Sequence, residues 1–414
     1  METSWRAPAG DPAIGDGMIY EFGEFVLDTR RHELWRGGTP QHLEPQVYAV
    51  LCHLVENRDR LVTSRELIEH VWGPRFITPG TLNSRIKALR QALGDDGTTQ
   101  CVIQTVRGRG FRIGVQVRDR SDTPRSPAPP AVEQVIRYCR AHDGVRIAYA
   151  TSGDAAGPAL VKPANWLTHL DQDCNSAVWR HWVSELGRGR RLIRYDERGC
   201  GLSDHDVDDL SFETWVRDLE AVVDAEGLER FSLLGISQGC AVAIAYTVRH
   251  PERVDKLVLY GGYAVGRNHR NPTPQDVLEA TLLRNLIRVG WGRDNPAFRQ
   301  VFGMLFLPEG TPGQWQWFSD LARTLPMENA LRIMDTTHEI DVRALAELVD
   351  KPTLVLHSVY DAMIPFETGR KLAALIPRAR FVPLESRNHV LLEGEPAWAR
   401  FLSEVRAFLG DEQA

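Results

Sequence analysis

Residues 231–254 read FSLLGISQGCAVAIAYTVRHPERV, and this stretch decides the fold. An apolar run typical of a β-strand leads into GISQG at residues 235–239, and an alanine-rich run typical of a helix follows. A nucleophilic serine needs this strand–turn–helix context, because the flanking glycines permit a sharp turn that exposes the hydroxyl. The helix N-terminus also stabilises negative charge beside it. We interpret Ser237 as a nucleophile. The alternative is a Gly/Ser turn without chemistry.

A serine hydroxyl is a weak nucleophile and needs a base that an acid orients. Asp361 lies in the loop after the strand-like segment TLVLHS, and His389 lies in the loop after the next one. Both loops are expected at the same edge of a sheet as the serine. We therefore predict a triad of Ser237, Asp361 and His389. The alternatives are a turn-forming aspartate and a surface histidine.

Strand-like and helical segments alternate over residues 134–414, which predicts a mostly parallel sheet covered by helices. Residues of about 263–345 interrupt this alternation, look mainly helical and are expected to form an inserted cap. The predicted strands are Val145–Ala150, Ala159–Val161, Arg191–Tyr195, Phe231–Leu234, Lys256–Tyr260, Thr353–His357 and Arg380–Pro383.

Residues 18–117 have a different pattern: two short strand-like runs, three helical runs and a closing hairpin around residues 108–110. This order predicts a winged helix–turn–helix domain that binds double-stranded DNA. The third helix, about residues 80–93, has one apolar face and one polar face, and a solvated surface is the alternative for the latter. The predicted DNA-binding residues are Thr81, Asn83, Ser84, Arg85, Lys87 and Arg90 in that helix, with Arg107, Arg109 and Arg112 in the hairpin.

Composition and charge agree with two folded regions. The net charge of the chain is −6, but residues 18–117 hold 13 Lys and Arg against 11 Asp and Glu. Residues 1–17 are expected to be disordered, and the Pro- and Ser-rich residues 118–133 to form a linker. The six cysteines are scattered, and no signal peptide or membrane-spanning run is evident. We expect a cytoplasmic protein without membrane contact, metal or organic cofactor.

The motifs LEPQVYAVLCHLVENRDRLVTSRELIEHVW, TLNSRIKALRQALGDD and IQTVRGRGFRI resemble the winged-helix effector domain of OmpR/PhoB-type response regulators. The resemblance implies that the helix of residues 81–93 enters the major groove and that the Arg107–Arg112 hairpin contacts the backbone. That family usually carries a receiver domain in front, and only 17 residues precede this domain. We therefore expect the regulatory input to come from the C-terminal domain.

The motifs RYDERGCGLSD, GISQGC, PTLVLHSVYDAMIP and ESRNHVLLEGEP resemble the α/β-hydrolase superfamily, especially hydrolase domains fused to winged-helix or cyclase modules in bacterial signalling proteins. The resemblance implies a lid, an acyl pocket and Ser237 as nucleophile. Ala164-Asn165 replaces the usual His-Gly of the oxyanion loop. Trp166 then supplies a backbone N–H beside that of Gln238, or the Asn165 side chain donates. We interpret residues 196–198 as a structural ion-pair turn.

Three functions remain open at this point. In the first, a dimeric one-component regulator binds DNA and senses a small acyl, ester or lactone ligand in its hydrolase domain, with hydrolysis as an added step. The second is a serine esterase with an accessory DNA-binding module. The third is a catalytically inactive receptor. The homodimer is expected because one winged helix reads only a half-site.

Overall fold

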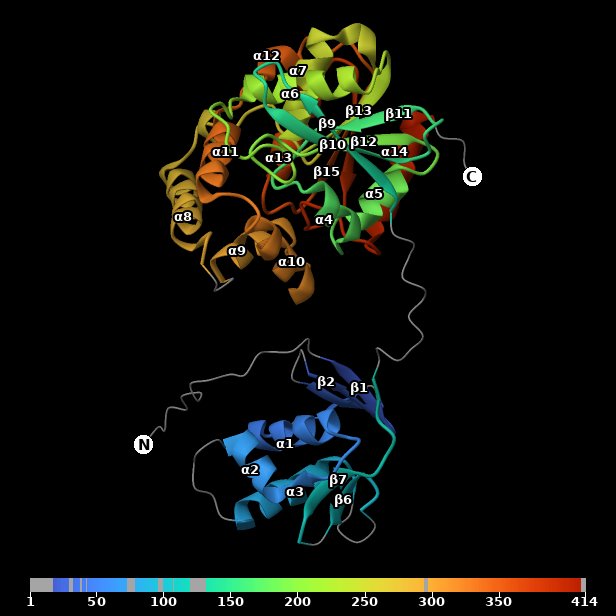
Figure 1. Cartoon of the computed structure of the whole chain (residues 1–414), viewed down its shortest axis with the longest axis vertical. Coiled ribbons are helices and arrows are strands. Elements are labelled where there is room, and N and C mark those ends of the chain that lie inside the picture. The colour runs from blue at the N-terminus through green and yellow to red at the C-terminus, as the bar shows by residue number, and fades with distance from the viewer. Residues whose placement is uncertain are drawn as a thin grey trace. The chain divides into compact units, whose positions relative to one another are not determined.

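The computed structural model describes residues 18–29, 33–37, 39–41, 43–72, 79–95, 100–106, 108–119, 132–293 and 297–410. The chain divides into two compact units, Met1–Pro130 and Ala131–Ala414 (Figure 1). Each unit has its own hydrophobic core.

The N-terminal unit begins with an antiparallel sheet in the order β4-β3-β2-β1-β8. Its strands are β1 (Ile19–Phe22), β2 (Phe25–Asp28), β3 (Glu33–Arg36), β4 (Thr39–Gln41) and β8 (Arg118–Asp119). The last strand pairs Asp119 with Tyr20 and Arg118 with Glu21, so these first two residues of the predicted linker belong to the sheet. Residues 120–131, most of that linker, lie outside the described residues, as do residues 1–17.

The rest of this unit is the helix–turn–helix and wing. Its elements are α1 (Pro45–Glu56), β5 (Val62–Thr63), α2 (Ser64–Trp72), α3 (Pro79–Ala92), β6 (Ile103–Val106) and β7 (Gly110–Ile113). The predicted apolar face of the third helix is buried, with Leu82, Ile86 and Leu89 all in the core. The Asp95 carboxylate follows α3 and accepts hydrogen bonds from the backbone of Cys101 to Ile103 at 2.7 to 3.1 Å, which anchors the wing to the helix. The predicted winged-helix fold is confirmed.

The C-terminal unit contains an eight-stranded sheet in the order β16-β15-β14-β13-β11-β12-β10-β9. Its strands are β9 (Gln134–Arg140), β10 (Arg146–Gly153), β11 (Ala159–Lys162), β12 (Arg191–Tyr195), β13 (Phe231–Ile236), β14 (Val254–Tyr260), β15 (Thr353–Ser358) and β16 (Ala379–Leu384). All pairs from β12 to β16 are parallel, whereas β10 runs antiparallel to both neighbours. The predicted mostly parallel sheet is confirmed.

The edge strand β9 was not among the strands predicted from the sequence. Its side chains are half-buried or exposed along its whole length, and it carries Arg137 and Arg140. No buried apolar run therefore marks it. Its order comes from the backbone ladder with β10, which extends from Gln134 to Arg140.

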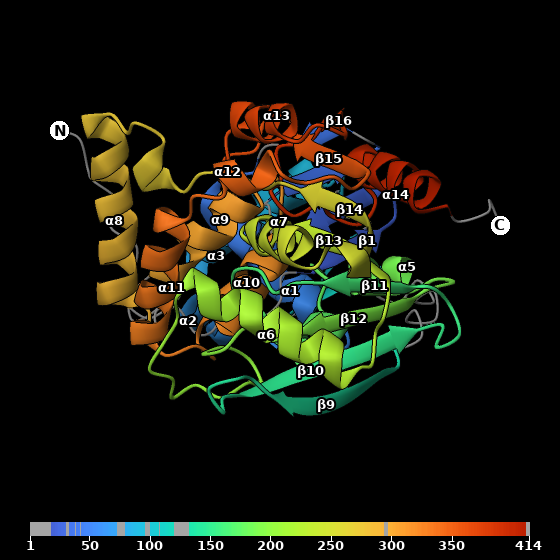
Figure 2. The same cartoon turned by 90° about the horizontal axis from the view of Figure 1, so that it is seen from above.

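Helices cover both faces of the large sheet (Figures 1 and 2). On one side lie α6 (Phe212–Ala225), α7 (Gly239–Arg249) and α13 (Phe366–Leu375); on the other lie α5 (Arg180–Leu186) and α14 (Pro396–Leu409). The second pair is joined by aromatic packing, since the Trp182 ring lies 4.7 Å from that of Trp398 and 4.8 Å from that of Phe401. A short helix, α4 (Leu170–Asn175), contacts α5, and a 3-10 turn, Pro251–Arg253, follows α7 and contacts it.

A group of helices between β14 and β15 forms the predicted cap. It contains the 3-10 helix η3 (Arg267–His269), α8 (Pro274–Gly290), α9 (Ala297–Phe306), α10 (Pro312–Ala322), α11 (Met327–Glu339) and α12 (Arg343–Ala346). Capping boxes start α8 at Thr273 and α10 at Thr311. The carbonyl of Phe306 accepts hydrogen bonds from the backbone of His389 (2.8 Å) and Val390, so α9 is tied to the histidine loop.

The loop after β12 is held by a buried ion network. The guanidinium of Arg198 is fully buried and donates to the Asp218 carboxylate at 2.6 and 2.7 Å and to Asp143 at 2.6 Å. Burial opposes the charge on Arg198, but the two carboxylates outweigh burial and raise its pKa. The interpretation of residues 196–198 as an ion-pair turn agrees with this arrangement at Arg198. Among the described residues, no helix is long and apolar enough to span a bilayer.

This network predicts a large difference between two arginines of the same unit. Arg198→Ala leaves the fully buried Asp218 carboxylate without its partner, and removing one member of such a pair costs about 3–5 kcal/mol of unfolding free energy. Arg217→Ala removes an exposed pair with Glu213 and is expected to cost about 0–1 kcal/mol. Urea unfolding of both variants beside the wild type measures the difference. Equal losses would contradict the assignment of the network to stability.

Candidate functional site

Ser237 lies at the turn between β13 and α7 in a strained backbone conformation. Its φ is +54°, in the left-handed region that residues with a side chain rarely adopt. Its N–H donates to the Tyr260 carbonyl at 3.0 Å, which ties the turn to β14. A Cβ at Gly235 would lie 2.6 Å from Cys240 Cα, and one at Gly239 would lie 2.7 Å from the Ala164 carbonyl oxygen. The two glycines therefore make this turn possible.

The structure brings the predicted acid and base together. Nδ1 of His389 lies 2.7 Å from Oδ2 of Asp361, and both side chains are buried. Nε2 of His389 is also buried and has no hydrogen-bond partner among the described residues. With Nδ1–H donating to the carboxylate, Nε2 carries a free lone pair that is able to accept a proton.

Asp361 is held from several directions at once. Its Oδ1 accepts the backbone N–H groups of Met363 (2.8 Å) and Ile364 (2.9 Å), and its Oδ2 lies 3.7 Å from Nε2 of His357. Burial opposes ionisation, but His389, His357 and the backbone donors outweigh it and lower the pKa of Asp361. The carboxylate is therefore charged at neutral pH and fixed for its contact with His389.

His357 also lies beside Asp361 and His389, although the sequence motifs did not predict it as a site residue. It is a buried residue of β15, and its Nε2 contacts the Ile364 carbonyl at 2.9 Å. Burial lowers its pKa, so its ring is neutral at neutral pH. The i, i+4 spacing from Asp361 across a strand end is the only sequence signal for this contact.

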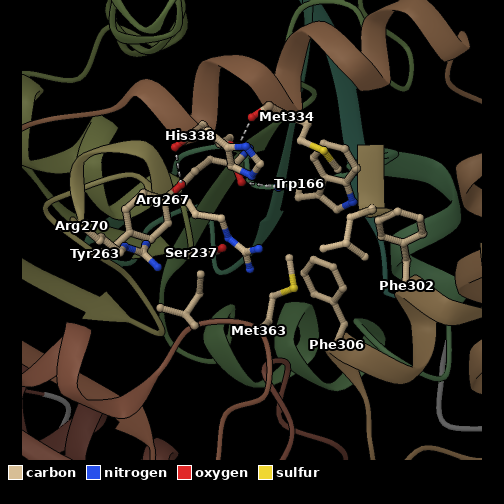
Figure 3. Close-up of a pocket in the computed structure, with 14 residues that line it drawn as sticks. Trp166, Ser237, Tyr263, Arg267, Arg270, Phe302, Phe306, Met334, His338 and Met363 are labelled. Atoms are coloured by element: carbon tan, nitrogen blue, oxygen red, sulfur yellow. Dashed lines mark hydrogen bonds between the residues drawn. The ribbon is translucent and has the colours of Figure 1, made fainter. Parts of the chain in front are cut away.

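Ser237 faces a pocket between the sheet edge and the cap (Figure 3). Gln238 and Trp166 line it from the turn and from the loop after β11. Phe302 and Phe306 of α9 form part of its apolar wall, and Phe306 also packs edge-on against the His389 ring at 5.3 Å. No cluster of three His, Cys, Asp or Glu residues able to hold a metal ion occurs in the described part of the chain.

The predicted oxyanion donor at Trp166 is already used by a side chain. The Trp166 N–H donates to Oε1 of Gln238 at 2.9 Å, and Nε2 of Gln238 donates to Glu197 at 3.2 Å. Burial raises the pKa of Glu197 to about 8. Gln238 therefore bridges the loop after β11 and the loop after β12, and its amide oxygen occupies the Trp166 N–H.

The Asn165 side chain, which was the alternative donor to the oxyanion, does not point into the pocket. Its Oδ1 accepts a short hydrogen bond from Nζ of Lys162, its Nδ2 contacts the Trp166 carbonyl, and the pocket lining does not include it. Lys162 is itself buried, and burial lowers its pKa. Asn165 thus holds the loop after β11 through Lys162 and the Trp166 carbonyl.

The polar face of α3 is divided between exposed side chains and internal contacts. Asn83, Ser84 and Lys87 are exposed, and Ser84 also bonds the Gly80 carbonyl. Arg85 forms an ion pair with Glu44 at 2.7 Å, and Thr81 is half-buried.

The remaining predicted contacts lie between α3 and the wing. Arg90 donates to the Ile103 carbonyl at 2.7 Å and to Thr105, so it ties the helix to β6. Arg109 and Arg112 are exposed on the wing, where Arg112 contacts Gln104 at 2.8 Å. Arg107 lies outside the described residues. The exposed set that the structure presents for DNA is therefore smaller than the predicted set.

Two family models match the chain. Residues 38–113 match the transcriptional regulatory protein, C-terminal, family, and residues 166–396 match the alpha/beta hydrolase fold family. The second match begins at Trp166 and contains Ser237, Asp361 and His389.

Curated relatives and solved structures cover the C-terminal unit. The chain is 31% identical over 258 residues to 2-hydroxymuconate semialdehyde hydrolase from Pseudomonas sp. (strain CF600), covering 58% of this chain and 83% of the relative. It is 28% identical over 218 residues to AB hydrolase superfamily protein YisY from Bacillus subtilis (strain 168), covering 52% and 81%. An esterase from Exiguobacterium antarcticum shares the fold, with a TM-score of 0.58 and 23% identity over 67% of this chain and 100% of that one.

The relatives are hydrolases, and the N-terminal match is a DNA-binding regulatory domain. The chain belongs to the alpha/beta hydrolase fold family, and it carries a DNA-binding domain of the transcriptional regulatory protein, C-terminal, family in front of its hydrolase domain.

Proposed function

We propose that this protein is a DNA-binding regulator whose hydrolase domain binds a small acyl compound and hydrolyses it at Ser237. One observation carries the catalytic half: a strained serine faces a pocket beside a His389–Asp361 pair whose Nε2 is buried and without a partner. Strain of this kind at a polar side chain is typical of functional sites. The sensing half rests on the fusion, because a metabolic esterase gains nothing from a DNA-reading helix.

The geometry supports the following sequence of steps. His389 Nε2 takes the Ser237 proton as Oγ attacks the ligand carbonyl, and Asp361 stabilises the imidazolium. The backbone N–H of Gln238, at the start of α7, stabilises the oxyanion, and that of Trp166 joins it once the Gln238 side chain moves aside. The leaving group receives the proton from His389. Water then attacks the acyl-enzyme with His389 as base, which releases the acid and restores Ser237.

A second candidate is a receptor that binds the ligand without turnover. The contact that favours it is the hydrogen bond from Trp166 N–H to Gln238, which occupies the proposed oxyanion donor. Ligand binding then replaces this bond without completing a reaction. The two candidates differ in whether Ser237 is activated, and this difference is measurable without knowing the substrate.

Labelling with a fluorophosphonate probe tests the activation of Ser237. The wild-type chain is expected to gain one phosphonyl group on Ser237, since the reaction needs an activated serine but no matched acyl group. Intact mass and peptide mapping measure the product, and Ser237→Ala is the control that must remain unlabelled. Absence of labelling in a folded wild-type protein would leave the receptor as the better function.

Gln238→Ala tests the occupied oxyanion donor. The variant keeps the backbone N–H of residue 238 and frees that of Trp166, so labelling is expected to accelerate. One such donor contributes about 10²–10³-fold to rate, which sets the upper limit of the gain. Gln238→Glu keeps an acceptor of the same length for the Trp166 N–H but loses the donor to Glu197, so it is expected to label no faster than the wild type. Equal labelling rates in wild type and Gln238→Ala would show that this contact does not limit the reaction.

The DNA-binding half is tested on duplexes selected from a random pool by the wild-type chain. Lys87→Ala is expected to weaken binding and to reduce the slope of log K against log salt by about 1, as loss of one phosphate contact does. Asn83→Ala is expected to relax base preference, because one good base contact discriminates by about 1–3 kcal/mol. Fluorescence anisotropy over a salt series measures both.

Arg36→Ala is the matched control for these DNA-binding variants. Arg36 is exposed in the same unit but belongs to β3 of the other sheet and pairs with Glu24. It is expected to bind like the wild type. If Lys87→Ala and Asn83→Ala also bind like the wild type, α3 is not the recognition helix.

A further inference from the structure

The pocket at Ser237 has two chemically different parts. Phe302, Phe306 and Met363 give it an apolar wall, and Arg267, Arg270 and His338 bring nitrogen groups to another part of its lining. Figure 3 shows the Arg267 side chain directed into the space that Ser237 faces. An acyl pocket that served only neutral ligands has no use for a guanidinium there, because an unpaired cation in a partly apolar site is costly.

Arg267 has a hydrogen-bond donor without an acceptor. It belongs to η3, and its Nη1 is buried with no hydrogen-bond partner among the described residues. Arg270 follows the same turn, donates its Nε to the Val265 carbonyl at 2.7 Å and lies over the Tyr263 ring at 4.9 Å. Arg270 is thus held in place, whereas part of the Arg267 fork remains available to a ligand.

The carboxylates around this part of the pocket are engaged elsewhere. Asp276 bonds Thr273 at the start of α8, Asp335 forms a bidentate pair with Arg284 at 2.8 and 2.9 Å, and Glu339 bonds His269 at 2.9 Å. In the described part of the chain, no carboxylate lies within ion-pair distance of Arg267 or Arg270. Neither guanidinium therefore has an ion-pair partner among the described residues, and the lowered pKa of Asp276 comes mainly from its bonds to Thr273, with only a small contribution from the charge of Arg267.

The third nitrogen group adds no charge at neutral pH. Burial, together with the charge on Arg267, lowers the pKa of His338 to about 4. Its neutral ring, on α11, remains a hydrogen-bond partner beside the two cations. The positive charge in this part of the pocket thus comes from the two arginines.

We propose that the ligand of this pocket carries an anionic oxygen group, a carboxylate in the first instance, that Arg267 binds through its free donors with Arg270 as a second cation. The ligand carbonyl then lies at Ser237 and its apolar portion lies against Phe302 and Phe306. The site selects an acidic acyl compound over a neutral ester of the same size. The placement of the carbonyl rests on the proposed function, whereas the anion subsite does not.

The experiment measures binding without turnover, in the full-length Ser237→Ala chain. The probes are 4-phenylbutyrate, its primary amide and 3-phenylpropylphosphonate. Calorimetry and thermal shift measure the affinity of each probe. The carboxylate is expected to bind at least about tenfold more tightly than the amide, since hydrogen bonds to charged groups contribute more than neutral ones. The phosphonate arm tells whether the site prefers a planar carboxylate or accepts any oxyanion.

Variants of the same chain assign the preference to Arg267. Adding Arg267→Gln is expected to lower carboxylate affinity by about 10-fold to 100-fold and to remove the difference between carboxylate and amide. Arg267→Lys is expected to keep part of that difference. Arg288→Gln removes one positive charge from α8 at an exposed position outside the pocket lining and is expected to bind like its parent.

The outcomes separate this inference from the proposed function. Equal affinity for carboxylate and amide, or a carboxylate preference that survives Arg267→Gln, overturns the anion subsite. Fluorophosphonate labelling of Ser237 in the wild-type chain is scored independently, because that probe is uncharged. Labelling without a carboxylate preference would support the hydrolase proposal and reject the anion subsite. A carboxylate preference without labelling would identify a receptor for an anionic ligand.

Discussion

The C-terminal unit depends on one backbone constraint, the left-handed turn at Ser237 between β13 and α7. The turn is sharp enough to direct a serine into the pocket only because Gly235 and Gly239 lack side chains that would collide with Cys240 and Ala164. It also places the start of α7 beside the loop after β11, so the proposed nucleophile and the proposed backbone donor of Gln238 are neighbours in the chain. The remaining strands of the parallel sheet then bring the Asp361 and His389 loops to the same edge.

Buried polar groups hold the loops around this edge in place. Arg198 is fixed by two carboxylates, Asn165 by Lys162, and Gln238 by Glu197 and the Trp166 N–H. Burying such groups is costly unless each finds a partner, so the loss of one partner is strongly destabilising and the loops have few alternative positions. Among these contacts, the Gln238 side chain occupies the Trp166 N–H, which is the second donor in the proposed reaction.

The two units present separate chemistries that the proposed function combines. On the N-terminal unit, Arg85 and Arg90 mainly hold α3 against α1 and the wing, while Asn83 and Lys87 face outward. On the C-terminal unit, the cap closes over Ser237 and contributes both an apolar wall and the two pocket arginines. A ligand that bridges Ser237 and Arg267 would contact both the sheet edge and the cap.

The sequence by itself determined the order of the two domains, the strand–turn–helix at Ser237 and the three helices and wing, because these features follow from local periodicity, glycine positions and short motifs. It also placed Asp361 and His389 in loops after neighbouring strands. Only the tertiary structure decided the orientation of Gln238 and Asn165, the pairing of Arg85 with Glu44, the edge strand β9 and the approach of Arg267 to Ser237. These depend on contacts between residues distant in the chain, and side-chain orientation there is set by burial and available partners, which no local pattern records.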